Sequence, residues 1–219
     1  MKKLQTLLIA GVAAGALMAA SAEASFIIDY ELTTDQGNTV TGTGLFEFED
    51  NATPPPDVFL TLTVTNTSSD NSSITAVGFD LAGDTFNFSF DDTNGWVLTS
   101  ATGGPMSGFD VCIATDANCT GGPPLTGVLA GTSLIFGFSF DSSLESAEEV
   151  RNQTLAGYND GSLRSTARFQ QVGPTGNDSA FVPGTPGNGT PVPEPATLAL
   201  LGIGLLGAGY MARRRRDEA

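Results

Sequence analysis

The chain has 219 residues, no histidine, two cysteines and a formal net charge of −15. This length suits one domain of ordinary size, and the missing histidine excludes Ser-His-Asp and Cys-His catalysis and any zinc site that uses histidine. Two cysteines alone cannot complete a tetrahedral structural zinc site, and the strong negative charge argues against nucleic-acid binding because phosphate groups would be repelled.

Residues 1–24 predict a secretory signal peptide. Lys2 and Lys3 form a basic start, and a mainly apolar run follows from residue 4 to residue 20. Ala22 and Ala24 are the small residues that a signal peptidase accepts, so we expect cleavage after Ala24. An uncleaved membrane anchor is the alternative, although the run is short for a helix that spans a bilayer.

The central part of the chain predicts a mostly β fold. Apolar and polar residues alternate with the period of two expected for strands with one buried face. The alternating segments are residues 28–32, 46–49, 60–65, 86–90 and 134–140, with turn-forming residues at 35–38, 54–57 and 93–95. We therefore expect an antiparallel β-sandwich or jelly roll over residues 25–172, with a core of phenylalanine side chains.

Two acidic turns could supply calcium ligands. Asp91, Asp92 and Asn94 stand beside a turn glycine, and Asp80 and Asp84 flank another turn. Neither turn matches the twelve-residue calcium loop, so an ordinary polar turn is the competing interpretation. We expect no cofactor, with calcium as the one candidate.

Aromatic residues and carboxylates allow two further interpretations. Trp96, Tyr30 and Tyr158 could stack on sugar rings if exposed, whereas buried rings would belong to the core. A glycosidase needs no histidine, only two carboxylates that face each other roughly 5–10 Å apart in a cleft. No pattern in the sequence identifies such a pair.

Cys112 and Cys119 are the only cysteines. In an exported chain, two cysteines favour a structural disulfide, which here would close a small hairpin loop. A redox role would need a tighter motif such as Cys-x-x-Cys.

One short surface helix is expected after the last alternating segment. Ser142 and Glu145 have capping-box spacing, residues 144–151 fit a helix, and Gly157 can end it. A final strand is expected at residues 165–172. Residues 173–192 are rich in glycine and proline and predict a flexible linker.

The last 27 residues combine a proline motif, a short apolar run at 196–212 and a terminal arginine cluster. The run is at the low end of the length needed for a transmembrane helix, and the arginines would remain on the cytoplasmic side. The residues that carry this pattern are Pro193, Glu194, Pro195, Arg213, Arg214, Arg215 and Arg216.

This order of elements resembles the PEP-CTERM sorting signal. The resemblance implies recognition by an exosortase (an integral-membrane cysteine transpeptidase), cleavage near the motif, and transfer to the surface of a Gram-negative bacterium that makes extracellular polysaccharide. It covers only about the last 25 residues and implies nothing about the central domain.

The region from Ser25 to Pro195 contains 21 acidic residues and three arginines, a net charge of −18. Such a surface favours solubility and can attract cations or cationic partners. We expect an exported, non-enzymatic surface or matrix protein that meets signal peptidase and exosortase during export and is held by the membrane through its C-terminal helix before processing. Its expected final partner is extracellular polysaccharide. A carbohydrate-binding module is the first alternative, and a carboxylate-based polysaccharide hydrolase is the second.

Overall fold

The computed structural model describes residues 24–50, 57–91, 95–99 and 105–187, which lie in one compact unit, Glu23–Val192. The predicted cleavage residue Ala22, the calcium candidates Asp92 and Asn94, the proline motif, the transmembrane run and the arginine cluster lie outside the described residues. Among the described residues, no helix is both long and apolar enough to cross a membrane.

The described residues form strands, one α-helix and one 3-10 turn. In chain order these are β1 (Ala24–Thr33), β2 (Thr39–Asp50), β3 (Asp57–Asn66), β4 (Ser73–Phe79), β5 (Thr85–Phe90), β6 (Val97–Thr99), β7 (Val111–Ala114), η1 (Pro124–Thr126), β8 (Val128–Leu129), β9 (Ser133–Ser142), α1 (Ala147–Asp160), β10 (Ser165–Val172) and β11 (Asp178–Pro186).

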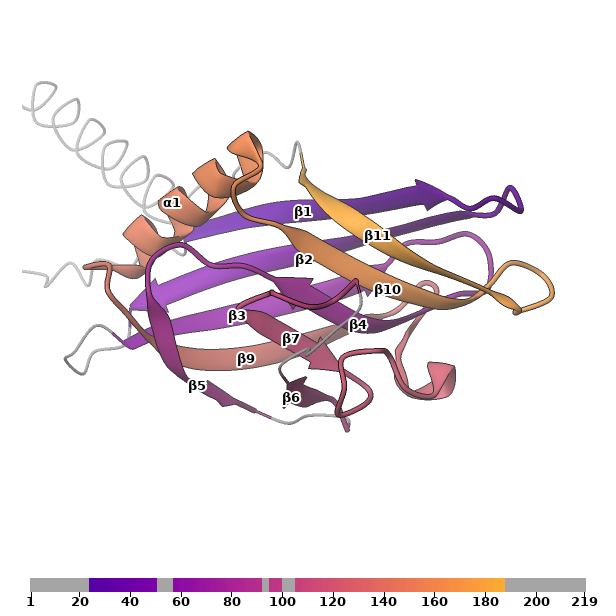
Figure 1. Cartoon of the computed structure of the whole chain (residues 1–219), viewed down its shortest axis with the longest axis horizontal. Coiled ribbons are helices and arrows are strands. Elements are labelled where there is room, and N and C mark those ends of the chain that lie inside the picture. The colour runs from indigo at the N-terminus through magenta and orange to yellow at the C-terminus, as the bar shows by residue number, and fades with distance from the viewer. Residues whose placement is uncertain (1–23, 51–56, 92–94, 100–104, 188–219) are drawn as a thin grey trace, which may run out of the picture. The chain divides into compact units, whose positions relative to one another are not determined.

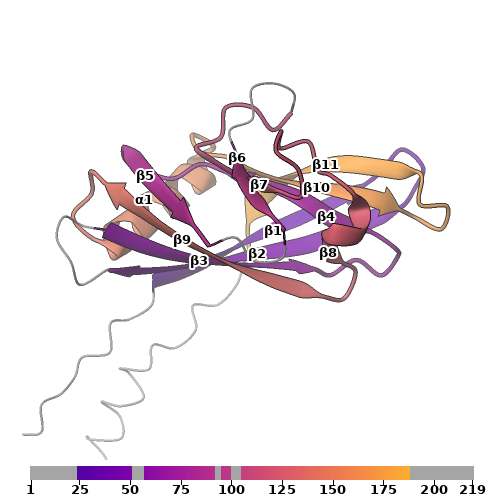
Figure 2. The ribbon, with the colours of Figure 1, turned by 90° about the horizontal axis from the view of Figure 1, so that it is seen from below.

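All the strands belong to one antiparallel sheet, in the order β5-β9-β3-β2-β1-β11-β10-β4-β7-β6, with β8 paired to β4. The sheet is nearly closed into a barrel, so that a first half (β5, β9, β3, β2 and β1) faces a second half (β11, β10, β4, β7, β6 and β8), as Figures 1 and 2 show. The predicted mostly β, antiparallel fold is confirmed. The sandwich or jelly roll is not, because pairing of β1 with β11 makes the sheet continuous.

Phenylalanine rings from the two halves meet in the core, as the alternating pattern predicted. Phe79 of β4 makes edge contacts with Phe46 of β2 and Phe138 of β9, at ring-centroid distances of 5.2 and 5.8 Å. The hydroxyl groups of Tyr30 and Ser165 are 2.7 Å apart and join β1 to β10 through the interior. Phe86 is an exception, because it pairs with Asp141 on the outer side of the sheet and is 49% exposed.

The helix α1 is longer and begins later than the sequence predicted. Ser146, not Ser142, is its N-cap, and its Oγ accepts a hydrogen bond from the Glu149 N–H at 3.2 Å. A second serine-glutamate pair with capping-box spacing therefore displaces the predicted start by four residues. The helix ends at Gly161, whose φ of 79° is the left-handed conformation that glycine adopts easily.

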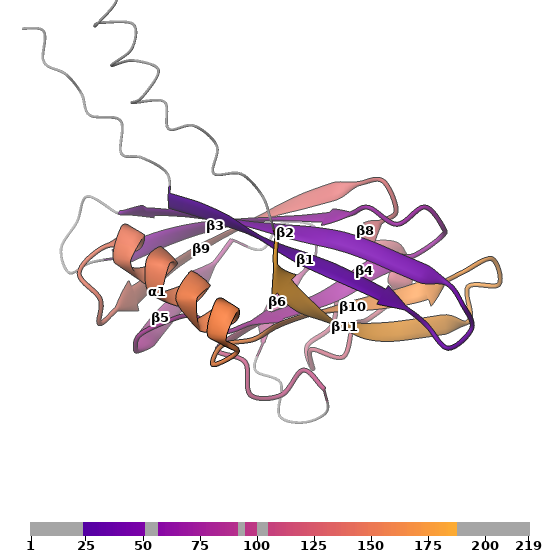
Figure 3. The same cartoon turned by 90° about the horizontal axis from the view of Figure 1, so that it is seen from above.

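Gly157, the predicted helix end, lies inside α1 for a packing reason. A Cβ atom there would stand only 2.5 Å from Cγ of Leu163. The helix packs against β1, β2 and β11 (Figure 3), and the Tyr158 and Phe26 rings contact each other at 5.8 Å.

The prediction of a flexible linker over residues 173–192 is wrong for residues 178–186. Residues 178–186 form β11, in which residues 178–183 pair with β10 and residues 184–186 pair with β1. Val182 is fully buried, and Gly184 leaves room for Ile28, which a Cβ atom would strike. Glycine and proline here allow close approach of strands, which composition alone could not distinguish from flexibility. Residues 188–192 lie outside the described residues.

Candidate functional site

The three aromatic candidates for sugar stacking are buried. Trp96 and Tyr30 are 0% and 1% exposed, and Tyr158 is 7% exposed. Trp96 Nε1 donates to the carbonyl oxygen of Thr126 at 3.2 Å, and the Tyr158 hydroxyl donates to the carbonyl oxygen of Asp80 at 2.7 Å. Burial raises the pKa of both tyrosines. These rings belong to the core and cannot form a carbohydrate platform.

The most buried carboxylate, Asp80, is bound to the backbone. Its Oδ1 accepts from the Asp110 N–H at 3.3 Å and its Oδ2 from the Arg164 N–H at 3.0 Å. Asp110 in turn accepts from the Leu81 N–H at 2.9 Å. Burial raises the pKa of Asp80, partly offset by the hydrogen bond from Arg164. This arrangement fastens loops together and gives the hydrolase interpretation no support.

The other acidic candidates form no recognisable centre. Asp160 lines a depression of about 580 Å³ with Asp110, but it accepts hydrogen bonds from Ser162 that lower its pKa. Asp91 is exposed. Within the described ranges, no three cysteine or acidic side chains are placed to hold a metal ion. The calcium expectation for Asp91, Asp92 and Asn94 stays a prediction.

A buried asparagine organises three connections at one end of the sheet. Asn66, at the end of β3, is fully buried. Its Nδ2 donates to the carbonyl oxygen of Ser72 at 3.2 Å and to that of Val128 at 3.0 Å, while its Oδ1 accepts from the Ser68 N–H at 3.2 Å. Its own carbonyl oxygen accepts from the Gly131 N–H at 2.8 Å. The side chain thus joins the turn before β4 to strand β8, and the backbone of the same residue holds the turn before β9.

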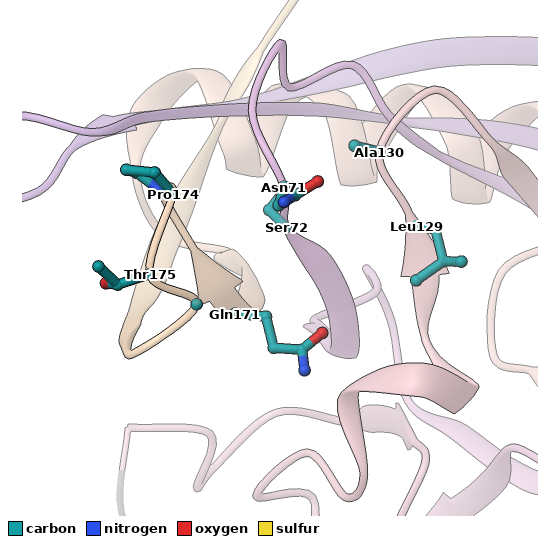
Figure 4. Close-up of a pocket in the computed structure, with 8 residues that line it drawn as sticks. Asn71, Ser72, Leu129, Ala130, Gln171, Pro174 and Thr175 are labelled. Carbon is teal, nitrogen blue, oxygen red and sulfur yellow. The ribbon is translucent and has the colours of Figure 1, made fainter.

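A pocket of about 450 Å³ opens beside these connections. We call it the Gln171 pocket, and its lining residues are Asn71, Ser72, Leu129, Ala130, Gln171, Pro174, Thr175 and Gly176. Figure 4 shows Pro174 and Thr175 on one side, Leu129 on the opposite side, and Asn71 and Ser72 between them. The lining combines amide and hydroxyl groups with apolar carbon and contains no charged side chain.

Gln171 adopts an unusual backbone conformation at this pocket. Its φ is +53°, a region that residues with a side chain rarely occupy. The pairing of β10 with β11 shifts between Gln170 and Val172, so Gln171 is the extra residue of a β-bulge. Bulges redirect side chains out of the regular pleat. Sequence reasoning missed the pocket because three distant segments form it and residues 174–176 were assigned to a linker.

The Gln171 pocket and the exit of the chain lie at opposite ends of β11. Gly176 lines the pocket, β11 runs from Asp178 to Pro186, and Gly187 then donates to the carbonyl oxygen of Ile27 at 2.8 Å. At 3.4 Å per residue, the strand separates the two points by roughly 30 Å. Figure 1 shows the β10–β11 turn at one end of β11 and the last residues of the strand at the other.

Comparison with known proteins identifies the kind of signal at the C-terminal end of the chain. Residues 191–216 match a family model for proteins that are exported and sorted to the cell surface by an exosortase. The model is that of the PEP-CTERM protein-sorting motif, which confirms the resemblance predicted from the proline motif and the arginine cluster. No curated protein and no solved structure matches the chain.

Proposed function

We propose that this chain is a non-enzymatic protein of the cell surface or extracellular matrix. It is exported with its signal peptide, cleaved near Pro193, Glu194 and Pro195, and retained in extracellular polysaccharide. The observation that carries this proposal is the sorting motif at residues 191–216, which begins in the sequence where the compact unit Glu23–Val192 ends, with an overlap of two residues. The proposed role needs no cofactor.

The positions of the two predicted cuts support the proposal. Cleavage after Ala24 leaves Ser25 within β1, where its carbonyl oxygen accepts hydrogen bonds from Nε and Nη2 of Arg151 at 3.0 and 2.6 Å. At the other end, Gly187 is still hydrogen-bonded to Ile27. Of the residues in the described strands, the two cuts therefore remove only Ala24, the first residue of β1.

Intact-mass measurement of the protein recovered from its host tests this function. We expect a species that begins at Ser25 and ends near Pro195. Replacement of Arg213, Arg214, Arg215 and Arg216 by alanine should abolish the C-terminal cut, because these charges fix the orientation of the apolar run. The matched control replaces Asp217 and Glu218 by alanine and should be processed normally. A wild-type species that retains residues 196–219 would contradict sorting by cleavage.

Fractionation tests the matrix role separately. The processed protein should sediment with the extracellular polysaccharide and be released when that polymer is digested. Recovery of the processed protein as a freely soluble species in the medium, with or without digestion, would leave sorting intact but remove the matrix role.

A further inference from the structure

We propose that the Gln171 pocket binds a neutral sugar unit. This inference rests on the proposed function, which places the protein in extracellular polysaccharide. It assigns the contact with that polysaccharide to one end of the domain.

The chemistry of the lining selects the ligand class. Asn71 and Gln171 each offer an amide donor and an amide acceptor, and Thr175 offers a hydroxyl group. Leu129 and Pro174 supply apolar surface across the same space. Alternating hydroxyl groups and C–H faces are the features of a sugar ring, which such a mixed surface complements.

The charge distribution argues against charged ligands in the pocket. The region between the two predicted cuts has a net charge of −18, yet no acidic or basic side chain lines the pocket. Tight binding of a divalent cation draws on charged carboxylate ligands, and tight binding of an anion draws on arginine or lysine. A neutral, hydroxyl-rich molecule needs neither.

The walls of the pocket are fixed before any ligand arrives. The Gly173 N–H donates to the carbonyl oxygen of Asn71 at 3.1 Å, and the Ala130 N–H donates to that of Ser72 at 3.1 Å. Behind them, Asn66 binds both Ser72 and Val128. A preformed site loses less conformational entropy on binding, which matters for ligands that offer only a few weak contacts.

Gln171 itself points to a binding role. At a φ of +53° a glycine would fit without strain, and the exposed glutamine side chain has no core packing to offset that strain. Strained residues of this kind cluster at ligand sites, where the conformation aims a functional group. In addition, the pocket volume of about 450 Å³ lies within the range of small-molecule sites.

The position of the pocket suits a polymer outside the cell. It lies at the end of β11 opposite to Gly187, after which the chain continues toward the sorting motif. A ligand at that end of the strand leaves Gly187, the last described residue before the sorting motif, uncovered.

The test is affinity electrophoresis of the protein in the form recovered from its host. The gels contain dextran, mannan or galactan as neutral polymers, or alginate as a polyuronate. We expect retardation by at least one neutral polymer and none by alginate. Gln171→Gly should weaken this binding at least about tenfold, because the loss of amide hydrogen bonds removes that much affinity. Its melting temperature should be equal or higher, because glycine relieves the strained φ.

Two further variants complete the design. Asn71→Ala should weaken binding to a similar degree, because it also removes a side-chain amide from the pocket. The backbone carbonyl oxygen of residue 71 still accepts from Gly173, so the wall of the pocket should remain in place. Gln36→Gly makes the same change at an exposed residue of the β1–β2 turn, outside the pocket, and should bind normally. Retardation only by alginate, no retardation by any polymer, or unchanged binding by both pocket variants would overturn the inference. Sorting would be unaffected by any of these results, because intact mass measures it independently.

Discussion

The outer faces of the two sheet halves are built differently. On the first half, Phe59 of β3 and Ile135 of β9 are 40% and 62% exposed. On the second half, the segments on either side of β7, residues 105–110 and 115–122, lie against the outside of β4 and β10, and Ala76 of β4 and Cys112 of β7 are 0% and 1% exposed. One face meets solvent, whereas the other lies beneath these two segments, which we call the cover, and a disulfide joins Cys119 of the cover to Cys112 of β7.

The difference follows from which side chains point outward. The solvent-facing half carries β-branched residues such as Thr61, Thr63 and Thr65, which suit a pleated and partly exposed surface. The covered half has small outward residues, and Phe109 packs so closely on Gly78 that a Cβ atom would lie 2.6 Å from its ring. The size of the outward-pointing side chains thus indicates whether another segment packs over a strand.

Two arginine side chains hold the cover against the sheet. Arg164 lies over the Phe109 ring at 5.0 Å, and Arg168 lies over the Phe181 ring at 4.9 Å. Arg168 also donates to the carbonyl oxygen of Thr120. Basic residues are scarce in this acidic domain, and these two are used to fix its cover.

The largest expected effect comes from adding a side chain beneath the cover. Gly78→Val should lower the free energy of unfolding by about 3 kcal/mol, because Phe109 would have to move. The matched change on the solvent-facing half is Gly137→Val, where a Cβ atom would lie an ordinary 3.4 Å from Phe59. This control should change stability by less than about 0.5 kcal/mol. Urea denaturation compares the two, and equal losses would remove the distinction between the faces.

Removal of the disulfide should have the next largest effect. Cys112 and Cys119 are separated by 7 residues, and the double alanine variant should lose about 2.5 kcal/mol by the loop-entropy model. In urea denaturation, added reductant should lower the free energy of unfolding of the wild type and leave that of the alanine variant unchanged. A reductant effect of equal size on the alanine variant would show that the bridge is not the cause.

Asp80 links the cover to the second half and should make that link depend on pH. Because burial raises its pKa in the folded state, its contribution to stability is greatest below the ordinary aspartate pKa and falls as the pH rises through the raised value. Asp80→Asn should cost about 1–2 kcal/mol by losing a backbone hydrogen bond. The gap between wild type and variant, measured by urea denaturation, should be wider at acidic pH than at pH 7. A gap that widens toward pH 7 would reverse this assignment.

The smallest effect is expected at the rim of the cover. The Arg164 side chain is 60% exposed and stands 3.7 Å from Asp80, so its ion pair is screened by solvent. Arg164→Ala should therefore cost about 0.5–1 kcal/mol, mainly through the lost contact with Phe109. Arg164→Lys should recover part of this in thermal denaturation. A loss as large as that of Gly78→Val would mean that the arginine, not the packing, holds the cover.

The same contrast explains which strands the sequence predicted. Strands β1, β2, β3 and β9 alternate because one face is buried and one meets solvent, and period-two reasoning found them. Strand β4 is buried at every position, since the cover hides its outer face, so it shows no alternation and was missed. The disulfide was predictable because a chain predicted to be exported, with two cysteines, favours a bridge between them.

The candidate site was harder to predict than the fold. The Gln171 pocket depends on a bulge in β10 and on turns brought together by the side chain of Asn66, and neither leaves a periodic pattern. The hypothesis of exposed aromatic rings was wrong because the polar atoms of these residues have partners inside the protein. Trp96 and Tyr30 have a polar atom that could face solvent, but each finds a partner inside the protein, with Thr126 and Ser165.

The position of β11 also has a mechanical consequence. A polymer held in the Gln171 pocket and an attachment at the C-terminal end would pull on opposite ends of this one strand. Hydrogen bonds between antiparallel strands run across the strand direction, so the tension would load the bonds to β10 and β1 together, in shear, instead of opening them one after another. Strand β11, which its glycine and proline content assigned to a flexible linker, would then transmit the force through the domain.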